Sequence, residues 1–358
     1  MQTITFLHQP SVPVEFHKGV VVQALELLPI EQRLAAAMTA GCNTFLLKTK
    51  DIFLDMLTDS GTNALSNQQL GAMMLADEAY AGSQSFDRLE ASVREFFDKQ
   101  FFLPVHQGRA AEHILAEVFV RPGDVVPMNF HFTTTCAHIE RKGATVRELI
   151  VDEVFQVKSK HPFKGNMDLK KLEATIQEVG VAKIPFVRME VTTNLTGGQP
   201  VSLDNLEAVQ RITKRHGLML VVDACLIAEN AWFIKQREQK HSDKTLQQII
   251  HRISKLADII YFSARKLGAA RGGGIVTSDR QLWAKMKDMV PLFEGFFTYG
   301  GMSTREIEEA PRLISLGTPV LRLVYEDMHR DVHLARHQLF AHLGLDDKAA
   351  APLSHETR

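Results

Sequence analysis

The feature that most constrains the fold of this chain is an alternation of short apolar runs with amphipathic helical segments in its second half. The runs at 184–191, 218–222 and 259–262 are short and rich in β-branched or aromatic residues, as buried strands are. Between the first two runs, Ser202 is a predicted helix N-cap and Gly217 a predicted helix end. Because right-handed crossovers join parallel strands of one sheet, the alternation predicts an α/β fold with a mainly parallel sheet.

Each predicted strand is followed by a polar side chain that can take part in chemistry. Asn194, Asp223 and Lys266 follow the three runs in order, so a shared parallel sheet would bring them to one edge. A lysine desolvated beside cations such as Arg265 loses affinity for its proton and becomes nucleophilic, as a Schiff base requires. The glycines at 272–274 would let the backbone pass close to whatever the lysine holds. For this stretch alone, a surface lysine on a basic turn is the favoured interpretation.

A second candidate feature is the turn of Gln107, Gly108 and Arg109, which leads directly into a strong helix-forming sequence at 110–119. Free N–H groups at a helix N-terminus point toward an incoming anion, and the two long side chains would add donors. The turn therefore predicts a phosphate site, although it is less specific than a full glycine-rich motif.

A carboxylate, an amide and a lysine beside a phosphate site meet the requirements of pyridoxal phosphate. Asp223 would keep the pyridine nitrogen protonated, Lys266 would bind the aldehyde, and the turn would hold the phosphate. Phe132 lies in a segment at 129–135 that we interpret as strand-like and ending in three hydroxyls. Its ring could stack on a planar ligand or fill the core, and without context the core is the favoured interpretation.

Two polar turns in the first third of the chain have both a structural and a functional interpretation. The segment at 57–64 groups hydroxyls and a carboxylate around Gly61, as a turn with a helix N-cap or as an anion or metal site. In the segment at 77–83, Tyr80 would be a general acid only if its environment shifted its pKa. The structural interpretation is favoured for both. A solvated face is likewise favoured over a metal site for three histidines on a predicted helix at 320–343, His329, His333 and His337.

Composition excludes several classes of function. The 358 residues suffice for one large or two medium domains, and the net charge of −1 with scattered Lys and Arg predicts no nucleic-acid partner. No basic-then-apolar leader and no apolar run long enough for a membrane span occur in the sequence. Three cysteines far apart in the chain predict a reducing compartment without disulfides. We therefore expect a soluble, cytoplasmic protein.

From about Gly41 to the early 340s, the sequences of these motifs and their order along the chain resemble those of the tyrosine phenol-lyase and tryptophanase family. These are the β-eliminating lyases of aromatic amino acids. The resemblance rests on segments at Phe45–Leu47, Leu57–Thr62, Asp77–Ser83, His106–Arg109, Phe163–Asn166, Gly197–Ser202, Glu229–Lys235 and Tyr299–Gly301. The sequences of Thr62–Ala64 and Asn194–Gly198 resemble those of tyrosine phenol-lyase more than those of tryptophanase.

The resemblance implies a role for each matching residue. Lys266 would form the internal aldimine and later move the α-proton of an amino-acid substrate, while Asp223 would pair with the pyridinium nitrogen. Phe132 would stack on the ring and Asn194 would contact the ring oxygen. The residues implied to hold the phosphate are Gln107, Gly108, Arg109 and Ser263. The implied reaction is β-elimination of an aromatic L-amino acid to an arene, pyruvate and ammonia.

The resemblance also implies an assembly and a fold. Tyr80 would protonate the leaving aromatic ring from a neighbouring subunit of a homotetramer, and Gly61 and Glu78 would help to bind a potassium ion. The fold would be of the aspartate-aminotransferase type (fold type I). We expect residues 1–50 to form an N-terminal arm and part of the small domain, 51–318 the large cofactor domain, and 319–358 a linker helix with the start of the C-terminal small domain.

Three departures from the family pattern bear on activity. Leu226 stands where the family has an arginine that faces the ring oxygen of the cofactor, and Arg265 replaces a lysine. The family arginine that grips the substrate carboxylate would lie beyond residue 358. These departures predict normal cofactor loading with slow or absent β-elimination. A tryptophanase-like indole-lyase, and a cofactor-binding but catalytically degenerate assembly partner, remain alternatives.

Overall fold

The computed structural model describes residues 25–55, 57, 60, 65–267 and 270–315, together with two short strands at 3–4 and 12–13. The chain divides into one unit of Met1–Leu57 with Pro319–Arg358 and a second unit of Thr58–Thr318. Gly61 and the histidine-bearing segment at 320–343 lie outside the described residues, so their roles stay predictions. The predicted domain boundaries also stay predictions.

The smaller unit contains one described α-helix. Helix α1 spans Ile30–Thr39, and Gly41, with φ of +61°, follows its end as the sequence predicts. Apolar residues recur at helical spacing from about Val20 to Met38 and predict a longer helix, but residues 25–29 are not helical. Pro29 disfavours helical geometry at Leu28, the residue before it. The other elements of this unit are two paired strands and two 3₁₀ turns: β1 (Thr3–Ile4), β2 (Val12–Pro13), Thr44–Leu46 and Thr49–Asp51.

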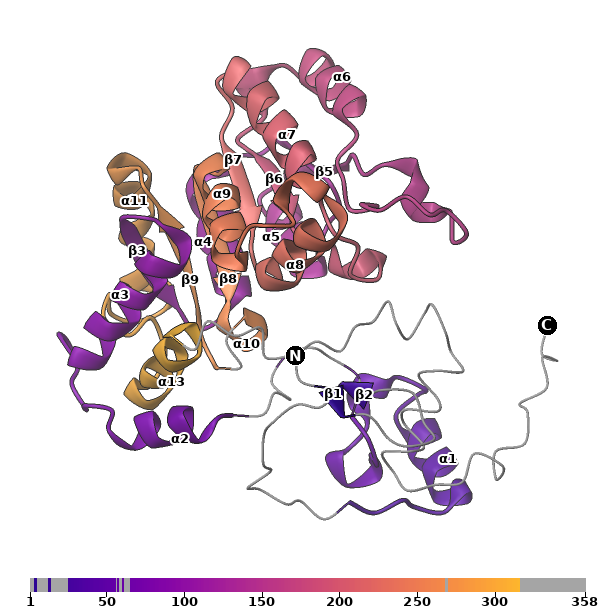
Figure 1. Ribbon diagram of the computed structural model, residues 1–358, viewed down its shortest axis with the longest axis vertical. Helices are drawn as coiled ribbons and strands as arrows, with labels where there is room; N and C mark the ends of the chain where they lie inside the picture. Colours follow the sequence, from indigo (N-terminus) through magenta and orange to yellow (C-terminus); the bar gives the residue numbers. More distant parts are fainter. Residues whose placement is uncertain are drawn as a thin grey trace. The chain divides into compact units, whose positions relative to one another are not determined.

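The larger unit is built on a seven-stranded sheet of described residues (Figure 1). Its strands, in spatial order, are β3 (Phe101–Val105), β9 (Gly273–Thr277), β8 (Ile259–Ser263), β7 (Leu220–Asp223), β6 (Val187–Glu190), β4 (Val125–Met128) and β5 (Thr145–Glu148). Strand β9 is antiparallel to both of its neighbours, and the other strands run parallel to one another. The mainly parallel sheet predicted from the sequence is confirmed.

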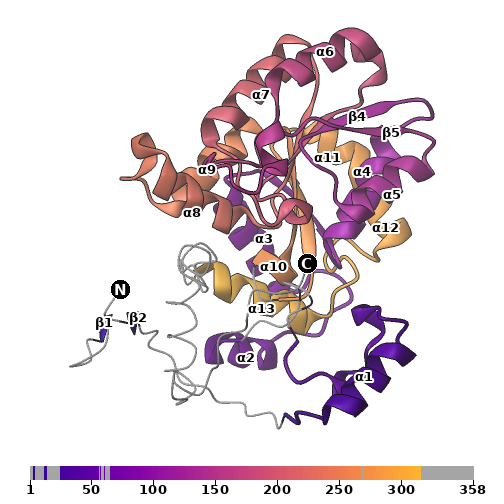
Figure 2. The ribbon, with the colours of Figure 1, turned by 90° about the vertical axis from the view of Figure 1, so that its right-hand side faces the viewer.

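Helices cover both faces of this sheet, and Figure 2 shows the two helical layers. Side chains alternate along each strand, so that Leu220 and Val222 of β7 enter one core while Val221 enters the other. The first core is closed by α3 (Gln84–Phe97), α6 (Leu169–Val179), α7 (Leu203–Arg215), α8 (Ile227–Arg237) and α9 (Leu246–Leu256). The second core is closed by α4 (Gly108–Phe119), α5 (Thr133–Arg141), α11 (Arg280–Lys287) and α12 (Met289–Phe293).

Three further α-helices lie in the described part of the larger unit. Helix α10 (Ala264–Leu267) follows β8 directly, and α13 (Thr304–Ser315) packs against both α3 and α2 (Asn67–Met74). Pro311 predicts an interruption of the helical pattern in this part of the sequence, and this prediction is wrong, since α13 continues through it. The loss of one backbone hydrogen bond is offset by the packing of this helix against two others.

Local sequence signals fix several of these helix ends. The Ser202 hydroxyl accepts the N–H of Asn205 at 3.0 Å and begins α7, which confirms the predicted N-cap. The predicted strand-like segment at 129–135 is wrong in its second half, because helix α5 begins at Thr133. The hydroxyls of Thr134 and Thr135 donate to the buried carboxylate of Glu112, and this tertiary contact overrides the strand propensity of threonine.

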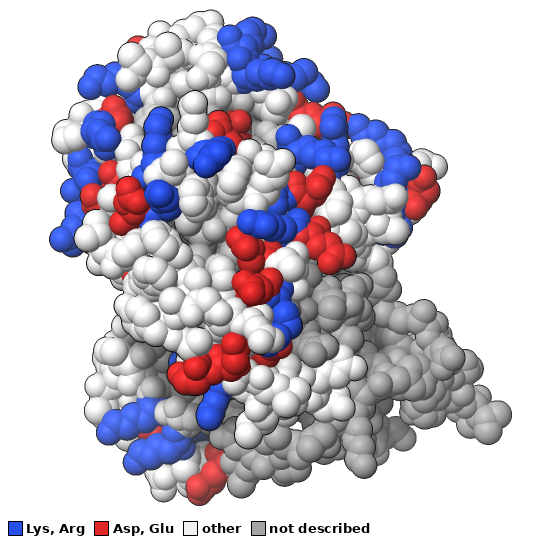
Figure 3. Space-filling view, turned by 90° about the vertical axis from the view of Figure 1, so that its left-hand side faces the viewer, with Lys and Arg blue, Asp and Glu red and all other residues white. Residues whose placement is uncertain are grey.

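Charged side chains of both signs lie on the surface of the described residues. On the face drawn in Figure 3, acidic and basic side chains are interspersed. Exposed ion pairs such as Arg252 with Glu207 and Lys255 with Asp98 join adjacent elements of the larger unit. None of the described helices is both long and apolar enough to span a bilayer.

Candidate active site

The carboxyl ends of β3, β7 and β8 bring the predicted phosphate turn to the strand that precedes Lys266. A Cβ atom added to Gly108 would lie 3.1 Å from Cβ of Ser263 and 3.5 Å from Sγ of Cys225. One added to Gly273 would lie 3.1 Å from the backbone nitrogen of Gly108. The turn, Ser263 and the start of β9 are therefore packed backbone to backbone, and α4 begins at Gly108 with its N-terminal N–H groups at this edge.

Lys266 lies on α10, one turn beyond the end of β8. Its ammonium nitrogen is 4.9 Å from the centroid of the Phe132 ring, within the range of a cation–π contact. Both side chains are half-buried. The structure thus brings together a lysine and an aromatic ring that are far apart in sequence, and Phe132 is not a core residue as first favoured.

Asp223 ends β7 and is buried among hydrogen-bond donors. Its Oδ2 accepts from Nη2 of Arg188 at 2.6 Å and from the hydroxyl of Tyr261 at 2.9 Å. Its Oδ1 accepts the backbone N–H of Cys225 at 3.0 Å. Asp223 is only 4% exposed, so these hydrogen-bond donors take the place of water around its carboxylate.

Arg188 is the buried cation of this cluster, and it is not among the residues predicted from the sequence. Beyond Asp223, its guanidinium donates to the Tyr261 hydroxyl at 2.8 Å, to Oε2 of Glu190 at 3.2 Å and to the carbonyl of Phe130 at 3.1 Å. A signal was present in the sequence. Arg188 and Glu190 interrupt an apolar strand at a spacing of two residues, which places both on one face.

Two further carboxyl groups share this cation. Burial raises the pKa of Glu190 to about 7, and burial also raises the pKa of Glu112. The Tyr261 hydroxyl lies 3.2 Å from Oε1 of Glu112 as well as 2.9 Å from Asp223, so its single proton can be donated to either. One guanidinium offers a single positive charge to three carboxyl groups, and the raised pKa of Glu190 favours its protonated form below about pH 7.

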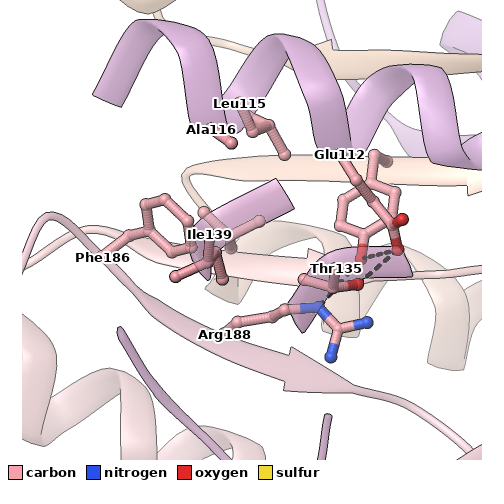
Figure 4. Close-up of a pocket in the computed structure, with 9 residues that line it drawn as sticks. Glu112, Leu115, Ala116, Thr135, Ile139, Phe186 and Arg188 are labelled. Carbon is pink, nitrogen blue, oxygen red and sulfur yellow. Dashed lines mark hydrogen bonds between the residues drawn. The ribbon is translucent and has the colours of Figure 1, made fainter. Parts of the chain in front are cut away.

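A cavity of about 10 Å³, room for one water molecule, lies beside this cluster on the α4 face of the sheet (Figure 4). Glu112, Thr135 and Arg188 point toward one another at one end of the cavity. The other end is apolar and is formed by Leu115, Ala116, Ile139 and Phe186. Three members of the charged cluster, Glu112, Arg188 and Tyr261, therefore line this cavity.

Asn194 follows β6 in a loop whose backbone is held in an unusual conformation. Thr192 has φ of +62°, which is rare for a β-branched residue. The fully buried Asn230 accepts the N–H groups of Thr192 at 3.1 Å and Val201 at 2.8 Å, and Glu190 accepts the N–H of Asn194 at 2.9 Å. These bonds fix the loop and hold Asn194 beside the end of its strand.

Leu226 is placed at the start of α8 by the same loop. Its carbonyl accepts the hydroxyl of Thr192 at 3.2 Å, and the residue is half-buried. The side chain brings an apolar group, with neither charge nor donor, to the position three residues after Asp223.

Tyr80 and Glu78 lie in another part of the larger unit. Tyr80 is 76% exposed, and its ring contacts Phe296 and Tyr299 at centroid distances of 5.9 and 5.7 Å. A hydrogen bond with Tyr299 raises the pKa of Tyr80. Glu78 accepts the hydroxyl of Thr304 at 3.3 Å. The contacts described for Tyr80 do not include Phe132 or Asp223.

Comparison with known proteins identifies the family. The model of the beta-eliminating lyases matches residues 55–339. The chain belongs to the beta-eliminating lyase family. Relatives include a tyrosine phenol-lyase of Lacrimispora saccharolytica, 45% identical over 80% of this chain and 62% of its own length, and one of Pasteurella multocida, 43% identical over 83% and 65%. The chain thus spans just under two thirds of the length of these relatives.

A solved structure supports the fold of this member of the beta-eliminating lyase family. A protein of Exiguobacterium sp. 255-15, described as an aromatic amino acid beta-eliminating lyase/threonine aldolase, aligns with a TM-score of 0.54. The alignment has 14% sequence identity and covers 75% of this chain and 70% of that one. The aspartate-aminotransferase-type fold (fold type I) expected from the sequence is confirmed.

The residues of the site fit the cofactor that the family implies, pyridoxal phosphate. Gly108 and Gly273 occupy positions where a Cβ would block the approach of the turn to its neighbours. A buried carboxylate, a lysine and an aromatic ring occur at the same edge of the sheet. These are the groups needed for a phosphate, a pyridine nitrogen, an aldehyde and a planar ring.

Proposed function

We propose that this chain is a pyridoxal-phosphate-dependent carbon–carbon lyase that acts on an aromatic L-amino acid and releases an arene, pyruvate and ammonia. The observation that carries the proposal is the position of Lys266 against the Phe132 ring, at the sheet edge that also bears Asp223 and the turn of Gly108. The names of the relatives, tyrosine phenol-lyases, support tyrosine or a related amino acid as substrate.

In this proposal each residue of the site has a binding or proton-moving task. Lys266 attaches the cofactor and moves the substrate α-proton, and Asp223 pairs with the pyridine nitrogen. Phe132 stacks on the ring, Asn194 contacts the ring oxygen, and the phosphate is held by Gln107, Gly108, Arg109 and Ser263. When bound, pyridoxal phosphate supplies an electron-withdrawing ring that stabilises negative charge at the substrate α-carbon.

The proposal extends to the assembly. Tyr80 protonates the leaving aromatic ring from a neighbouring subunit of a homotetramer, which agrees with its exposure of 76%. Glu78, with Gly61, contributes to a potassium site. The protein works in the cytoplasm. Sedimentation that shows only monomer at micromolar concentration would contradict the proposed assembly.

A second candidate function is favoured by Leu226. An apolar side chain at this position leaves the ring oxygen without a cationic partner, so cofactor binding could persist with little turnover. The chain would then be a cofactor-binding but catalytically degenerate relative that serves as an assembly partner. A tryptophanase-like activity differs from both in its product, indole.

Covalent trapping tests the shared core of these candidates. The protein is incubated with pyridoxal phosphate, reduced with borohydride and digested, and we expect the label on the peptide that contains Lys266. Lys266→Ala should abolish the label, whereas the matched control Lys255→Ala, an exposed lysine on α9, should keep it. An unlabelled Lys266 peptide after excess cofactor would contradict the proposal.

A product screen then separates the candidates. The loaded protein is supplied with tyrosine, tryptophan and related amino acids, and pyruvate, phenol and indole are measured. Phenol release supports the first candidate and indole release the tryptophanase-like alternative. Normal cofactor loading without either product supports the degenerate relative.

A further inference from the structure

A buried cation lies directly behind the carboxylate that is proposed to meet the cofactor. Arg188 is 1% exposed, and strand pairing of β6 with β7 sets Glu190 opposite Asp223 and Arg188 two residues earlier. A charged side chain so far from water is costly unless its partners compensate it. Each guanidinium nitrogen has such a partner in Asp223, Tyr261, Glu190 or the Phe130 carbonyl.

The contacts divide the two oxygens of Asp223 between two environments. Oδ2 accepts hydrogen bonds from the Arg188 guanidinium on β6 and from the Tyr261 hydroxyl on β8. These two donors occupy both of its lone pairs. Oδ1 accepts the backbone N–H of Cys225, the second residue after the strand, and so faces the edge where the ligand site lies. The Cys225 thiol also hydrogen-bonds to Asp223, and as a weak donor it can give way to the ring nitrogen at the second lone pair of Oδ1.

We propose that Arg188 is a positioning residue for the cofactor's pyridine nitrogen: it fixes Asp223 through Oδ2, leaves Oδ1 to the ring nitrogen, and adds a positive charge behind the pair. This inference rests on the proposed binding of pyridoxal phosphate. A positive charge disfavours protonation of groups close to it. Arg188 therefore lowers the pH at which the pair of Asp223 and ring nitrogen gives up its shared proton.

The other ionisable groups around Asp223 do not remove this effect. They come from the strands and helices packed against β7 and comprise Glu190, Tyr261, Glu112, Cys225 and Lys266. Burial raises the pKa of Glu190 and Glu112, so protons on these carboxyls reduce the negative charge that would otherwise offset Arg188. Burial likewise raises the pKa values of Cys225 and Tyr261, which keeps both neutral.

The first test needs no cofactor. Thermal unfolding midpoints are measured for the natural chain, Arg188→Met, Asp223→Asn and the double variant. Because either single change leaves a buried charge uncompensated, the double variant should lose less than the sum of the two single losses. Additive losses would show that Arg188 does not hold Asp223, and would overturn the inference whatever the protein binds.

The second test reads the ring nitrogen directly. The chain is loaded with pyridoxal phosphate labelled with nitrogen-15 in the ring, and the nuclear magnetic resonance shift is followed against pH. We expect Arg188→Met to raise the pH midpoint of ring-nitrogen deprotonation by about one unit or more. Arg147 on β5 pairs with Glu178 on α6 and provides the matched control. Arg147→Met should leave the midpoint of ring-nitrogen deprotonation unchanged.

A second variant keeps the test decisive if Arg188→Met does not fold. Arg188→Met with Glu190→Gln removes one positive and one acidic group together, and we expect a shift in the same direction because Arg188 contacts Asp223 directly. An unchanged midpoint with normal loading would overturn the inference alone. A natural chain that fails to bind the cofactor would overturn the proposed function and the inference with it.

Discussion

Gly273 occupies a point where two backbone segments approach more closely than a side chain allows. A Cβ there would lie 2.5 Å from the carbonyl oxygen of Phe262 and 3.0 Å from the carbonyl carbon of Gln107. We expect Gly273→Ala to displace the turn, to cost about 1–3 kcal/mol of stability, and to weaken pyridoxal phosphate binding. Chemical denaturation and a cofactor titration measure the two effects.

Gly71 provides the matched control for this substitution. It lies on α2 with φ in the ordinary range, and no atom lies within 4 Å of an added Cβ. Gly71→Ala should stabilise the protein by about 0.5–1 kcal/mol, because alanine is the better helix former. If Gly273→Ala behaved like Gly71→Ala, close packing would not be what shapes the phosphate turn.

Leu226 is the residue whose change should affect turnover without affecting loading. A hydrogen bond to a charged group is worth about 1.5–3 kcal/mol, so Leu226→Arg should raise the rate of β-elimination roughly tenfold to a hundredfold. Steady-state pyruvate release measures the rate, and Leu292→Arg on the exposed face of α12 is the control for an added charge. Brisk turnover by the natural chain, without further gain in Leu226→Arg, would contradict the assignment of a deficit to Leu226.

At the scale of single residues, the sequence predicted the positions of polar residues at strand ends better than those of polar residues within strands. The placement of Asp223 and Lys266 at strand ends was predicted because polar side chains there stand out from the apolar runs before them, whereas Ser263 was named only through the family resemblance. Tyr261 was missed because an aromatic side chain in a strand normally indicates core packing. Its hydroxyl joins Asp223 to Glu112, a contact that depends on which helix covers the strand.

At the scale of elements, α13 is tied to α3 by a largely buried carboxylate. Glu308 is 3% exposed and accepts two hydrogen bonds from Nε and Nη2 of Arg88, the shorter at 2.7 Å. Because Arg88 is nearly half-exposed and screened by water, we expect Glu308→Gln to cost only about 1–2 kcal/mol. Urea denaturation measures the change in free energy of unfolding.

A surface pair on the same helix gives the comparison. Arg94 and Glu90, four residues apart on α3, are joined at 2.8 Å and are more open to solvent. Arg94→Ala should change stability by no more than about 0.5 kcal/mol. Equal losses for the two variants would mean that the Arg88–Glu308 contact does not depend on burial.

Elements with local signals were predicted, and elements fixed by tertiary contacts were not. Helix α7 carries its own N-cap, apolar spacing and terminal glycine, and it lies where the sequence indicates. Helix α5 begins with three threonines, which favour a strand, and it forms because two of their hydroxyls reach Glu112 on α4. That partner lies more than twenty residues away and cannot be read from the segment itself.

At the scale of the whole larger unit, buried acids predict how stability changes with pH. Burial raises the pKa of Glu190 from its ordinary 4.5 to about 7, and burial raises that of Glu309 to about 7 as well. The folded protein therefore holds these protons more tightly than the unfolded chain does. Their contribution to stability is complete below about pH 4.5, declines as the pH rises, and is lost above about pH 7.

We therefore expect Glu190→Gln to flatten the dependence of unfolding free energy on pH between about 4.5 and 7. Urea denaturation at a series of pH values measures this slope. Glu95→Gln, at an exposed position on α3, is the control and should leave the slope unchanged. An identical slope in Glu190→Gln and the natural chain would show that Glu190 does not titrate in this window.

The position of β9 has a consequence for the order in which the site can be made. This strand is the last of the sheet in sequence, yet it lies between β3, the first, and β8, the one before it. During synthesis, the turn of Gly108 and the lysine of α10 are both complete before the strand that joins their supports has left the ribosome. The phosphate site is thus completed late in synthesis, only when β9 has joined the sheet.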